Sequence, residues 1–316
     1  MHRIRPGLYL GCRADAYDVQ ALRAAKITHI LTIELEPLEI HSNNFTYNFI
    51  QVADLPDKDL LSHFPECIAF IEDGIRKGGV MVHCFMGISR STTVVLAYLM
   101  RKDKKTLDSA FLHVKQIKQE VSPNHGFMEQ LRLFEAMGCP KNFEDHILYK
   151  QYKLERVARA VFDRSGYDDP VSSCIAKDPQ LYDEDEPQTV YKCRMCRRSI
   201  FKATSILKHK IGKGARTFKA KSGKLTYSDQ VVCTSIFIEP VAWMEQVLAG
   251  VIGGKLLCPK CNARLGSFNW AGDQCSCGTW VTPAFKIHCS KVDESKTSLP
   301  TTTAAVKGQP GGATAS

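Results

Sequence analysis

A seven-residue stretch with a cysteine at one end and an arginine at the other constrains this chain more than any other feature. The apolar run Val80–Val82 predicts a short buried strand, and apolar periodicity predicts a helix near Ser91–Arg101. Cys84 therefore stands where the strand enters a loop, and Arg90 stands where the loop meets the helix. Backbone N–H groups of such a loop can converge on one anion, and the helix dipole favours the same charge. This field stabilises a thiolate, while the planar guanidinium of Arg90 can bind two phosphate oxygens. The stretch predicts a nucleophile beside an anion cradle.

The sequence around this stretch predicts an α/β fold. Short β-rich runs alternate with helical patterns over the first 140 residues, which is typical of a mostly parallel central sheet flanked by helices. The expected strands are 8–10, 27–33, 47–52 and 80–82, and the expected helices are 15–25, 60–76, 91–101, 107–119 and 126–137. We therefore place a first domain at residues 1–140 and a helical extension at residues 141–162, where one more helix covers 143–162.

Charge and cysteine content indicate a second, C-terminal domain. Residues 191–290 hold 16 Lys and Arg against 4 Asp and Glu, a net charge of +12, although the whole chain carries only +9. Eight of the 13 cysteines also follow residue 190. Because 163–189 contains three prolines and the acidic run Asp183–Glu186, we expect an acidic linker there. We place a small β-rich domain at 190–290 and a disordered tail at 291–316.

The chain has no apolar run of roughly 18 residues, the length that a membrane span requires. Its first six residues also lack the apolar stretch of a secretory signal. We therefore expect no membrane partner, a reducing compartment, and residence in cytoplasm and nucleus. Cysteines in such a compartment are metal ligands, nucleophiles or buried small side chains rather than disulfides.

The fuller pattern His83-Cys84-x-x-Gly87-x-x-Arg90-Ser91 resembles the signature of cysteine-dependent protein phosphatases. Pro6–Gly11 and Pro123–Phe127 are similar to segments of the dual-specificity branch, and the resemblance covers about residues 3–140. It implies an enzyme that hydrolyses phosphoserine, phosphothreonine and phosphotyrosine in phosphorylated proteins. It also implies a cysteinyl-phosphate intermediate and no cofactor for catalysis.

The resemblance assigns roles to the residues of this loop. Cys84 attacks phosphorus, Arg90 and the loop amides stabilise the equatorial oxygens, and Ser91 hydrogen-bonds the sulfur. His83 orients the loop or is a satisfied buried histidine, and Asn124 holds the loop backbone. Met86 stands where the family usually has a small residue. Met86 and the remaining loop residues bind phosphate or support the loop: Phe85, Met86, Gly87, Ile88 and Ser89.

An acid is needed to protonate the leaving oxygen, and three candidates follow the strand that ends at Val52. Asp57 and Asp59 also lie where acids favour the start of the next helix. The family places its acid several residues before such a helix, which favours Asp54.

The C-terminal cysteines have metal-ligand spacing. Cys193-x-x-Cys196 and Cys258-x-x-Cys261 are two knuckles that can each give two thiolates to a tetrahedral Zn²⁺, and Cys275 and Cys277 form a third close pair. With Cys233 these are seven ligands, and His209 or His288 can supply the eighth. We expect about two structural zinc ions. We also expect the three tryptophans to belong to the core of this domain: Trp243, Trp270 and Trp280.

Residues 233–244 and 258–287 resemble the C-terminal zinc domain of the dual-specificity protein phosphatase 12 family and, more loosely, β-tent zinc domains. In β-tent domains both knuckles share one metal. The resemblance therefore implies one site of Cys193, Cys196, Cys258 and Cys261, and a second of His209, Cys233, Cys275 and Cys277. A sequential arrangement, with Cys258, Cys261, Cys275 and Cys277 together, is the alternative.

A basic run of seven Lys and Arg residues extends from Lys208 to Lys224, and residues 202–224 contain no acid. It is either a solvated loop or an electrostatic footprint for RNA or a pre-ribosomal particle. The family is linked to large-subunit maturation, so a ribosome-assembly factor with dispensable catalysis is the first alternative function. An RNA 5′-phosphatase is the second.

Overall fold

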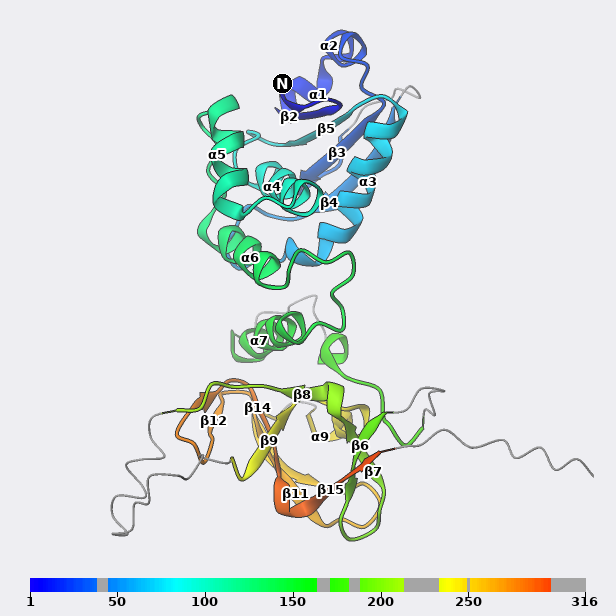
Figure 1. The fold of residues 1–316 in the computed structure, drawn as a ribbon, viewed down its shortest axis with the longest axis vertical. Coiled ribbons are helices and arrows are strands. Elements are labelled where there is room, and N and C mark those ends of the chain that lie inside the picture. The colour runs from blue at the N-terminus through cyan, green and yellow to red at the C-terminus, as the bar shows by residue number, and fades with distance from the viewer. Residues whose placement is uncertain (39–44, 164–170, 182–187, 213–232, 249–250, 297–316) are drawn as a thin grey trace, which may run out of the picture. The chain divides into compact units, whose positions relative to one another are not determined.

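The computed structural model describes residues 1–38, 45–163, 171–181, 188–212, 233–248 and 251–296 (Figure 1). The chain forms two compact units, Met1–Tyr149 and Lys150–Ser316. Among the described residues, no helix is both long enough and apolar enough to cross a bilayer.

The first unit is built on a five-stranded sheet of order β1-β2-β5-β3-β4. Its strands are β1 (His2–Arg5), β2 (Leu8–Cys12), β3 (His29–Glu34), β4 (Thr46–Gln51) and β5 (Val80–Cys84). Only β1, which the sequence did not predict, pairs antiparallel with its neighbour, whereas β2, β5, β3 and β4 run parallel. The predicted mostly parallel sheet is confirmed. Because parallel strands end at one edge, Cys84 lies at the same edge as the ends of β3 and β4.

Helices cover both faces of this sheet. The fully buried stretch Arg90–Met100 shows that α4 is the central helix. It packs on β5 and against α3, α5 and α6. On the other face, a separate apolar cluster joins Ala16 and Leu22 to Ile30 and Met81. The helices are α1 (Arg13–Tyr17), α2 (Val19–Ala24), α3 (Phe64–Lys77), α4 (Arg90–Asp103), α5 (Leu107–Ile117) and α6 (His125–Ala136), and the 3-10 turn Leu61–His63 precedes α3.

The single helix expected over 15–25 is two short helices. The chain breaks at Asp18, whose side chain accepts a hydrogen bond of 3.0 Å from the Ala21 N–H and so caps α2. An aspartate that caps a new helix competes with continuation of the old one.

The second unit is β-rich, as predicted. A five-stranded sheet has the order β10-β11-β14-β9-β8, a three-stranded sheet the order β15-β6-β7, and β12 and β13 form a hairpin. The strands are β6 (Thr189–Cys193), β7 (Ser199–Lys202), β8 (Ile206–Leu207), β9 (Ser235–Ile238), β10 (Gly253–Leu257), β11 (Arg264–Asn269), β12 (Asp273–Gln274), β13 (Trp280–Val281), β14 (Ala284–His288) and β15 (Val292–Lys296). The helices are α7 (Ile147–Asp163), which begins in the first unit, and α9 (Glu245–Leu248); 3-10 turns lie at Val171–Cys174, Ala203–Ser205, Ala242–Met244 and Cys289–Lys291.

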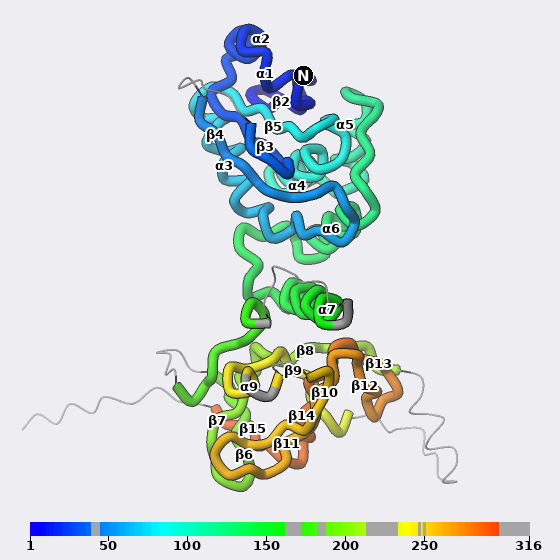
Figure 2. The backbone as a smooth tube through the Cα atoms, turned by 180° about the vertical axis from the view of Figure 1, so that it is seen from behind, coloured from blue at the N-terminus to red at the C-terminus, as the bar shows by residue number. Residues whose placement is uncertain are grey.

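The structure corrects two predicted boundaries. The linker expected over 163–189 is ordered in part, because Ala176 bridges to Val241 and buried Asp178 pairs with Arg198 at 2.7 Å. The tail expected over 291–316 is wrong for residues 292–296, which form β15 and pair along its length with β6, and residues 297–316 lie outside the described residues. Figures 1 and 2 show β15 beside β6, so the first and last strands of this unit close one sheet.

Candidate active site and metal centres

Cys84 is the last residue of β5 and lies at the edge of the sheet where the parallel strands end. Its side chain is 1% exposed, and its sulfur accepts a hydrogen bond of 3.2 Å from the Ser91 hydroxyl at the start of α4. A hydroxyl donor stabilises a thiolate more than a thiol, because the charged acceptor binds the proton more strongly.

The carbonyls of the loop point away from its centre. The Phe85 carbonyl accepts from the Arg13 N–H at 3.1 Å, and the Ile88 carbonyl from the Ser122 N–H at 3.0 Å. The Gly87 and Ser89 carbonyls accept from the Thr92 and Thr93 hydroxyls at 3.4 and 2.9 Å. Because each peptide is planar and trans, the N–H that follows an outward carbonyl points inward. The loop amides are thus arranged as an anion cradle.

Gly87 allows this loop to lie against β2. It has a φ of +69°, and a Cβ at this position would overlap the Gly11 carbonyl. Only glycine adopts that conformation and that close approach without strain.

Arg90 is fixed by an acid that the sequence analysis missed. Its Nη1 donates to the Glu34 carboxylate at 3.0 Å and to the Val52 carbonyl at 3.2 Å. Both side chains of the pair are buried, with exposed fractions of 8% and 7%. Glu34 ends β3, next to the strand that carries Cys84, so a lone acid closing an apolar run was the available signal.

Asp54 lies in the loop after β4 and faces the cradle. Its Oδ1 accepts from the Ser89 hydroxyl at 2.7 Å and from the Asn124 side-chain amide at 2.8 Å, while its Oδ2 lies 3.8 Å from Arg90 Nε. The rival Asp59 accepts from the Ser62 N–H near α3, and the rival Asp57 lies 3.6 Å from Lys58.

We expected Asn124 to hold the loop backbone, but its side chain makes other contacts. The side chain binds Asp54 and also caps α6 through the Phe127 N–H at 3.0 Å. Its backbone N–H instead donates to the Ser89 hydroxyl at 3.2 Å. Asn124 therefore links the acid loop to α6 and only indirectly supports the cradle.

His83 is buried beneath the loop and contacts the Thr32 hydroxyl at 2.8 Å through Nε2. Burial lowers the pKa of His83 to about 4, because desolvation penalises the charged imidazolium. The ring is therefore neutral at pH 7.

The second unit brings eight ligand side chains into two groups. Cys193, Cys196, Cys258 and Cys261 form one, and His209, Cys233, Cys275 and Cys277 form the other, with all ligand atoms of a group within 4.8 Å of one another. These are the sets that the resemblance implied, and they exclude the sequential arrangement. His288 belongs to neither group and lies 3.2 Å from the Ser235 hydroxyl.

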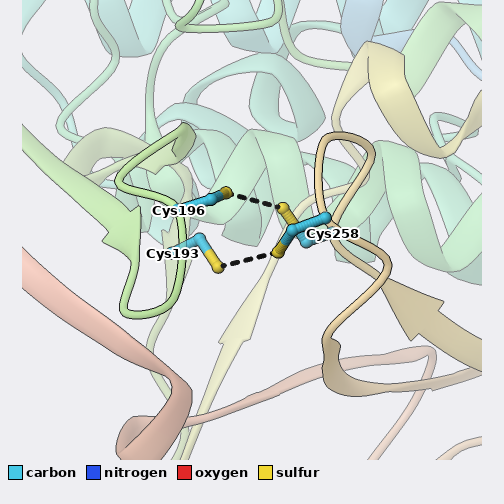
Figure 3. Close-up of side chains that lie close together, drawn as sticks. Cys193, Cys196 and Cys258 are labelled. Carbon is cyan, nitrogen blue, oxygen red and sulfur yellow. Dashed lines mark hydrogen bonds between the residues drawn. The ribbon is translucent and has the colours of Figure 1, made fainter.

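In the first group, Cys193 Sγ lies 3.8 Å from Cys261 Sγ, and Cys196 Sγ lies 3.5 Å from Cys258 Sγ (Figure 3). In the second, His209 Nε2 lies 3.5 Å from Cys233 Sγ and 3.3 Å from Cys277 Sγ. Either group could hold a metal ion.

Comparison with known proteins decides the family. Residues 8–137 match the family model of the dual specificity phosphatase catalytic domain. Over 93% of its length, the chain is 44% identical to dual specificity protein phosphatase 12 of Rattus norvegicus and covers 88% of that protein. The chain belongs to the dual specificity protein phosphatase 12 family. It is a cysteine-dependent protein phosphatase.

A fungal relative matches most of the chain, and a solved structure matches less than half of it. The tyrosine-protein phosphatase YVH1 of Saccharomyces cerevisiae is 33% identical over 94% of this chain and 93% of that protein. The crystal structure of DUSP15 is 39% identical, covers 45% of this chain and 90% of that chain, and has a TM-score of 0.43. Similarity to the phosphatase 12 relatives thus extends through both units.

Proposed function

We propose that Cys84 is the nucleophile of this phosphatase and Asp54 its general acid and base. Cys84 Sγ attacks phosphorus, the bond to the leaving oxygen breaks, and Asp54 transfers its proton to that oxygen. Asp54 then takes a proton from water, which attacks the cysteinyl phosphate and releases inorganic phosphate and the thiolate. The observation that supports this proposal is Asp54 bound to Ser89 of the cradle and 3.8 Å from Arg90, because an anion bound in the cradle would lie next to both the acid and the arginine.

The remaining residues support the reacting groups. Arg90 and the inward amides of the loop residues stabilise the oxygens of the transferred phosphoryl group. The Ser91 hydroxyl stabilises the sulfur as it leaves in the second step. Ser89 and Asn124 hold Asp54 at the rim of the cradle, and His83 holds the loop from beneath.

Two substitutions test these roles. Cys84→Ser should lower kcat on an aryl phosphate by at least about a thousandfold, because the serine hydroxyl is a far weaker nucleophile at neutral pH. Asp54→Asn should lower hydrolysis of phosphoserine peptides far more than that of p-nitrophenyl phosphate, whose leaving group needs no proton. Asp57→Asn is the matched control and should change neither. An Asp57 variant that shows the leaving-group dependence instead would move the acid to that residue.

We propose that each group in the second unit binds one structural Zn²⁺. Tetrahedral Zn²⁺ with Zn–S bonds of about 2.3 Å separates its sulfurs by about 3.8 Å, and a sulfur from a histidine nitrogen by about 3.6 Å. The observed S···S distances of 3.5 and 3.8 Å and N···S distances of 3.3 and 3.5 Å agree with this geometry. Thiolate-rich sets are also the ligands that Zn²⁺ prefers. Metal analysis should find about two zinc ions per chain, and fewer than one would contradict both sites.

We also propose that the second unit binds RNA or a pre-ribosomal particle, with the protein present in cytoplasm and nucleus. The net charge of +12 over residues 191–290 supports this proposal. Lys208 and Lys210 are exposed, and the rest of the basic run lies outside the described residues. Cells that lack the protein would receive Cys84→Ser or Cys258→Ser, and large-subunit maturation would be scored. Rescue by Cys258→Ser but not by Cys84→Ser would contradict an assembly role, whereas release of 5′-phosphate from RNA would favour an RNA phosphatase.

A further inference from the structure

Large apolar side chains are exposed around the candidate active site. Leu35, Leu55, Phe85 and Met86 have exposed fractions of 57%, 50%, 56% and 57%. We call these four residues the apolar rim. Single exposed apolar residues are ordinary, but a group of them gathered at one functional edge marks an interaction surface.

Each part of the apolar rim is joined directly to the site. Leu35 follows Glu34, the partner of Arg90, and Leu55 follows Asp54. Phe85 and Met86 follow Cys84. Because β3, β4 and β5 run parallel and end at one edge of the sheet, the rim residues belong to the loops at that edge.

The backbone of the apolar rim is held in place. The Leu35 carbonyl accepts from the Gln51 side-chain amide at 3.2 Å, and the Phe85 carbonyl from the Arg13 N–H at 3.1 Å. The Leu55 N–H donates to the Ala53 carbonyl at 2.9 Å. A surface whose backbone is fixed before binding loses less conformational entropy on contact.

We propose that the apolar rim binds apolar side chains next to the phosphorylated residue of a protein substrate, and so sets sequence preference. The inference rests on the proposed catalytic roles. A phosphate seated in the cradle brings the polypeptide that carries it across the loops at this edge, so the substrate chain is the occupant. Residues beside the phosphorylated one then reach the rim, where burial of a leucine or phenylalanine side chain stabilises the complex.

Charge next to the apolar rim disfavours the opposite class of substrate. Glu36 follows Leu35 and is exposed. Acidic residues beside the phosphorylated one would meet this carboxylate and find no apolar burial. The substrate class is therefore phosphopeptides with apolar rather than acidic neighbours.

The test uses the full-length chain and three substrates. Two phosphotyrosine peptides carry either Leu and Phe or Glu and Asp at the two positions on each side, and p-nitrophenyl phosphate serves as a small reference. The wild-type kcat/KM should be at least about tenfold higher for the apolar peptide than for the acidic one. In a Leu35→Ser, Leu55→Ser double variant, the ratio of apolar-peptide to p-nitrophenyl phosphate kcat/KM should fall about tenfold.

Leu112→Ser is the matched control, because Leu112 is 60% exposed on α5 and neighbours no site residue in the chain. It should leave the ratio unchanged. Equal hydrolysis of both peptides by the wild type would overturn the proposal. Higher activity of the double variant on p-nitrophenyl phosphate would also overturn the proposal. That result would mean that another part of this chain, or a second copy of it, covers the rim and restricts access to the site. A different result would contradict the proposed catalytic roles: the Cys84→Ser variant would still hydrolyse p-nitrophenyl phosphate.

Discussion

The two units hold their functional side chains in position in different ways. In the first unit, the site stands on a parallel sheet covered by helices, and α4 is buried from Arg90 to Met100. In the second unit, strands of two to six residues carry the ligands on turns between them. From this difference we expect the cradle to depend on apolar packing, and the second unit to depend on its ligand groups in addition to its own buried side chains.

The positions of the ligand groups explain this dependence. Cys193 and Cys196 belong to the β6–β7 hairpin of the three-stranded sheet, and Cys258 and Cys261 to the β10–β11 hairpin of the five-stranded sheet. A metal ion at this group would join the two sheets. The second group likewise joins His209 after β8 to Cys275 and Cys277 of the β12–β13 hairpin.

Metal removal should produce the largest difference between the two units. A zinc-selective chelator is expected to unfold the second unit, because the proposed zinc ions would supply much of its folding free energy. All three tryptophans lie in that unit, so their fluorescence reports its unfolding, while hydrolysis of p-nitrophenyl phosphate reports the first unit. We expect the fluorescence to change fully and the activity to stay within about twofold.

Two cysteine variants control this prediction. Cys258→Ser should lose about one metal ion, while Cys289→Ser should lose none, because Cys289 lies outside both groups and contacts the Cys233 carbonyl at 3.6 Å. Parallel loss of activity and fluorescence on chelation would contradict the independence of the two units.

Glu34→Gln should test how the first unit positions the Arg90 guanidinium. The amide keeps the size of the carboxylate but removes its charge, so Arg90 loses a charge-assisted hydrogen bond in a buried place. We expect kcat/KM to fall about a hundredfold, about 2.7 kcal/mol, and the Ki of the competitive inhibitor vanadate to rise.

Vanadate affinity separates positioning from folding, since a loss of folded protein lowers kcat but leaves Ki unchanged. Glu34→Asp should recover part of the affinity. An unchanged Ki in Glu34→Gln would show that the pair only stabilises the fold.

His83 should give the smallest effect, an acid sensitivity of the first unit. Its pKa falls from 6.5 to about 4 on folding, so between these values the unfolded chain binds more protons, and stability is lost as pH falls. From pH 7 to 5 the unfolding free energy of the first unit should drop by about 2 kcal/mol from this group. Urea midpoints of phosphatase activity would measure it. In His83→Asn, followed by circular dichroism, this part of the pH dependence should vanish.

Local patterns explain what the sequence could predict. Cys84 and Arg90 lie six positions apart between a strand and a helix, and the knuckle cysteines are three apart, so their chemistry is visible in short windows. Glu34 was missed because its partner lies 56 residues away and meets it only through the pairing of β3 with β5. The grouping of His209 with Cys277 spans 68 residues and came from resemblance, not from spacing.

Composition misled where tertiary contacts override it. β15 has the polar sequence of a disordered tail, yet Arg194 and Arg197 bind its Asp293 and the Tyr191 hydroxyl donates to its Glu294. Trp280 was expected in the core and is 62% exposed, whereas Trp270 is fully buried. Cross-strand partners of this kind are not visible in a single segment.

The phosphorylated intermediate tests the central claim most directly. The full-length chain would be mixed with p-nitrophenyl phosphate, quenched in acid within milliseconds and digested, and the phosphate located by mass spectrometry. We predict phosphate on the peptide that contains Cys84, and none in Cys84→Ser. Phosphate on another residue, or unchanged turnover with the sulfur of Cys84 blocked, would contradict the account.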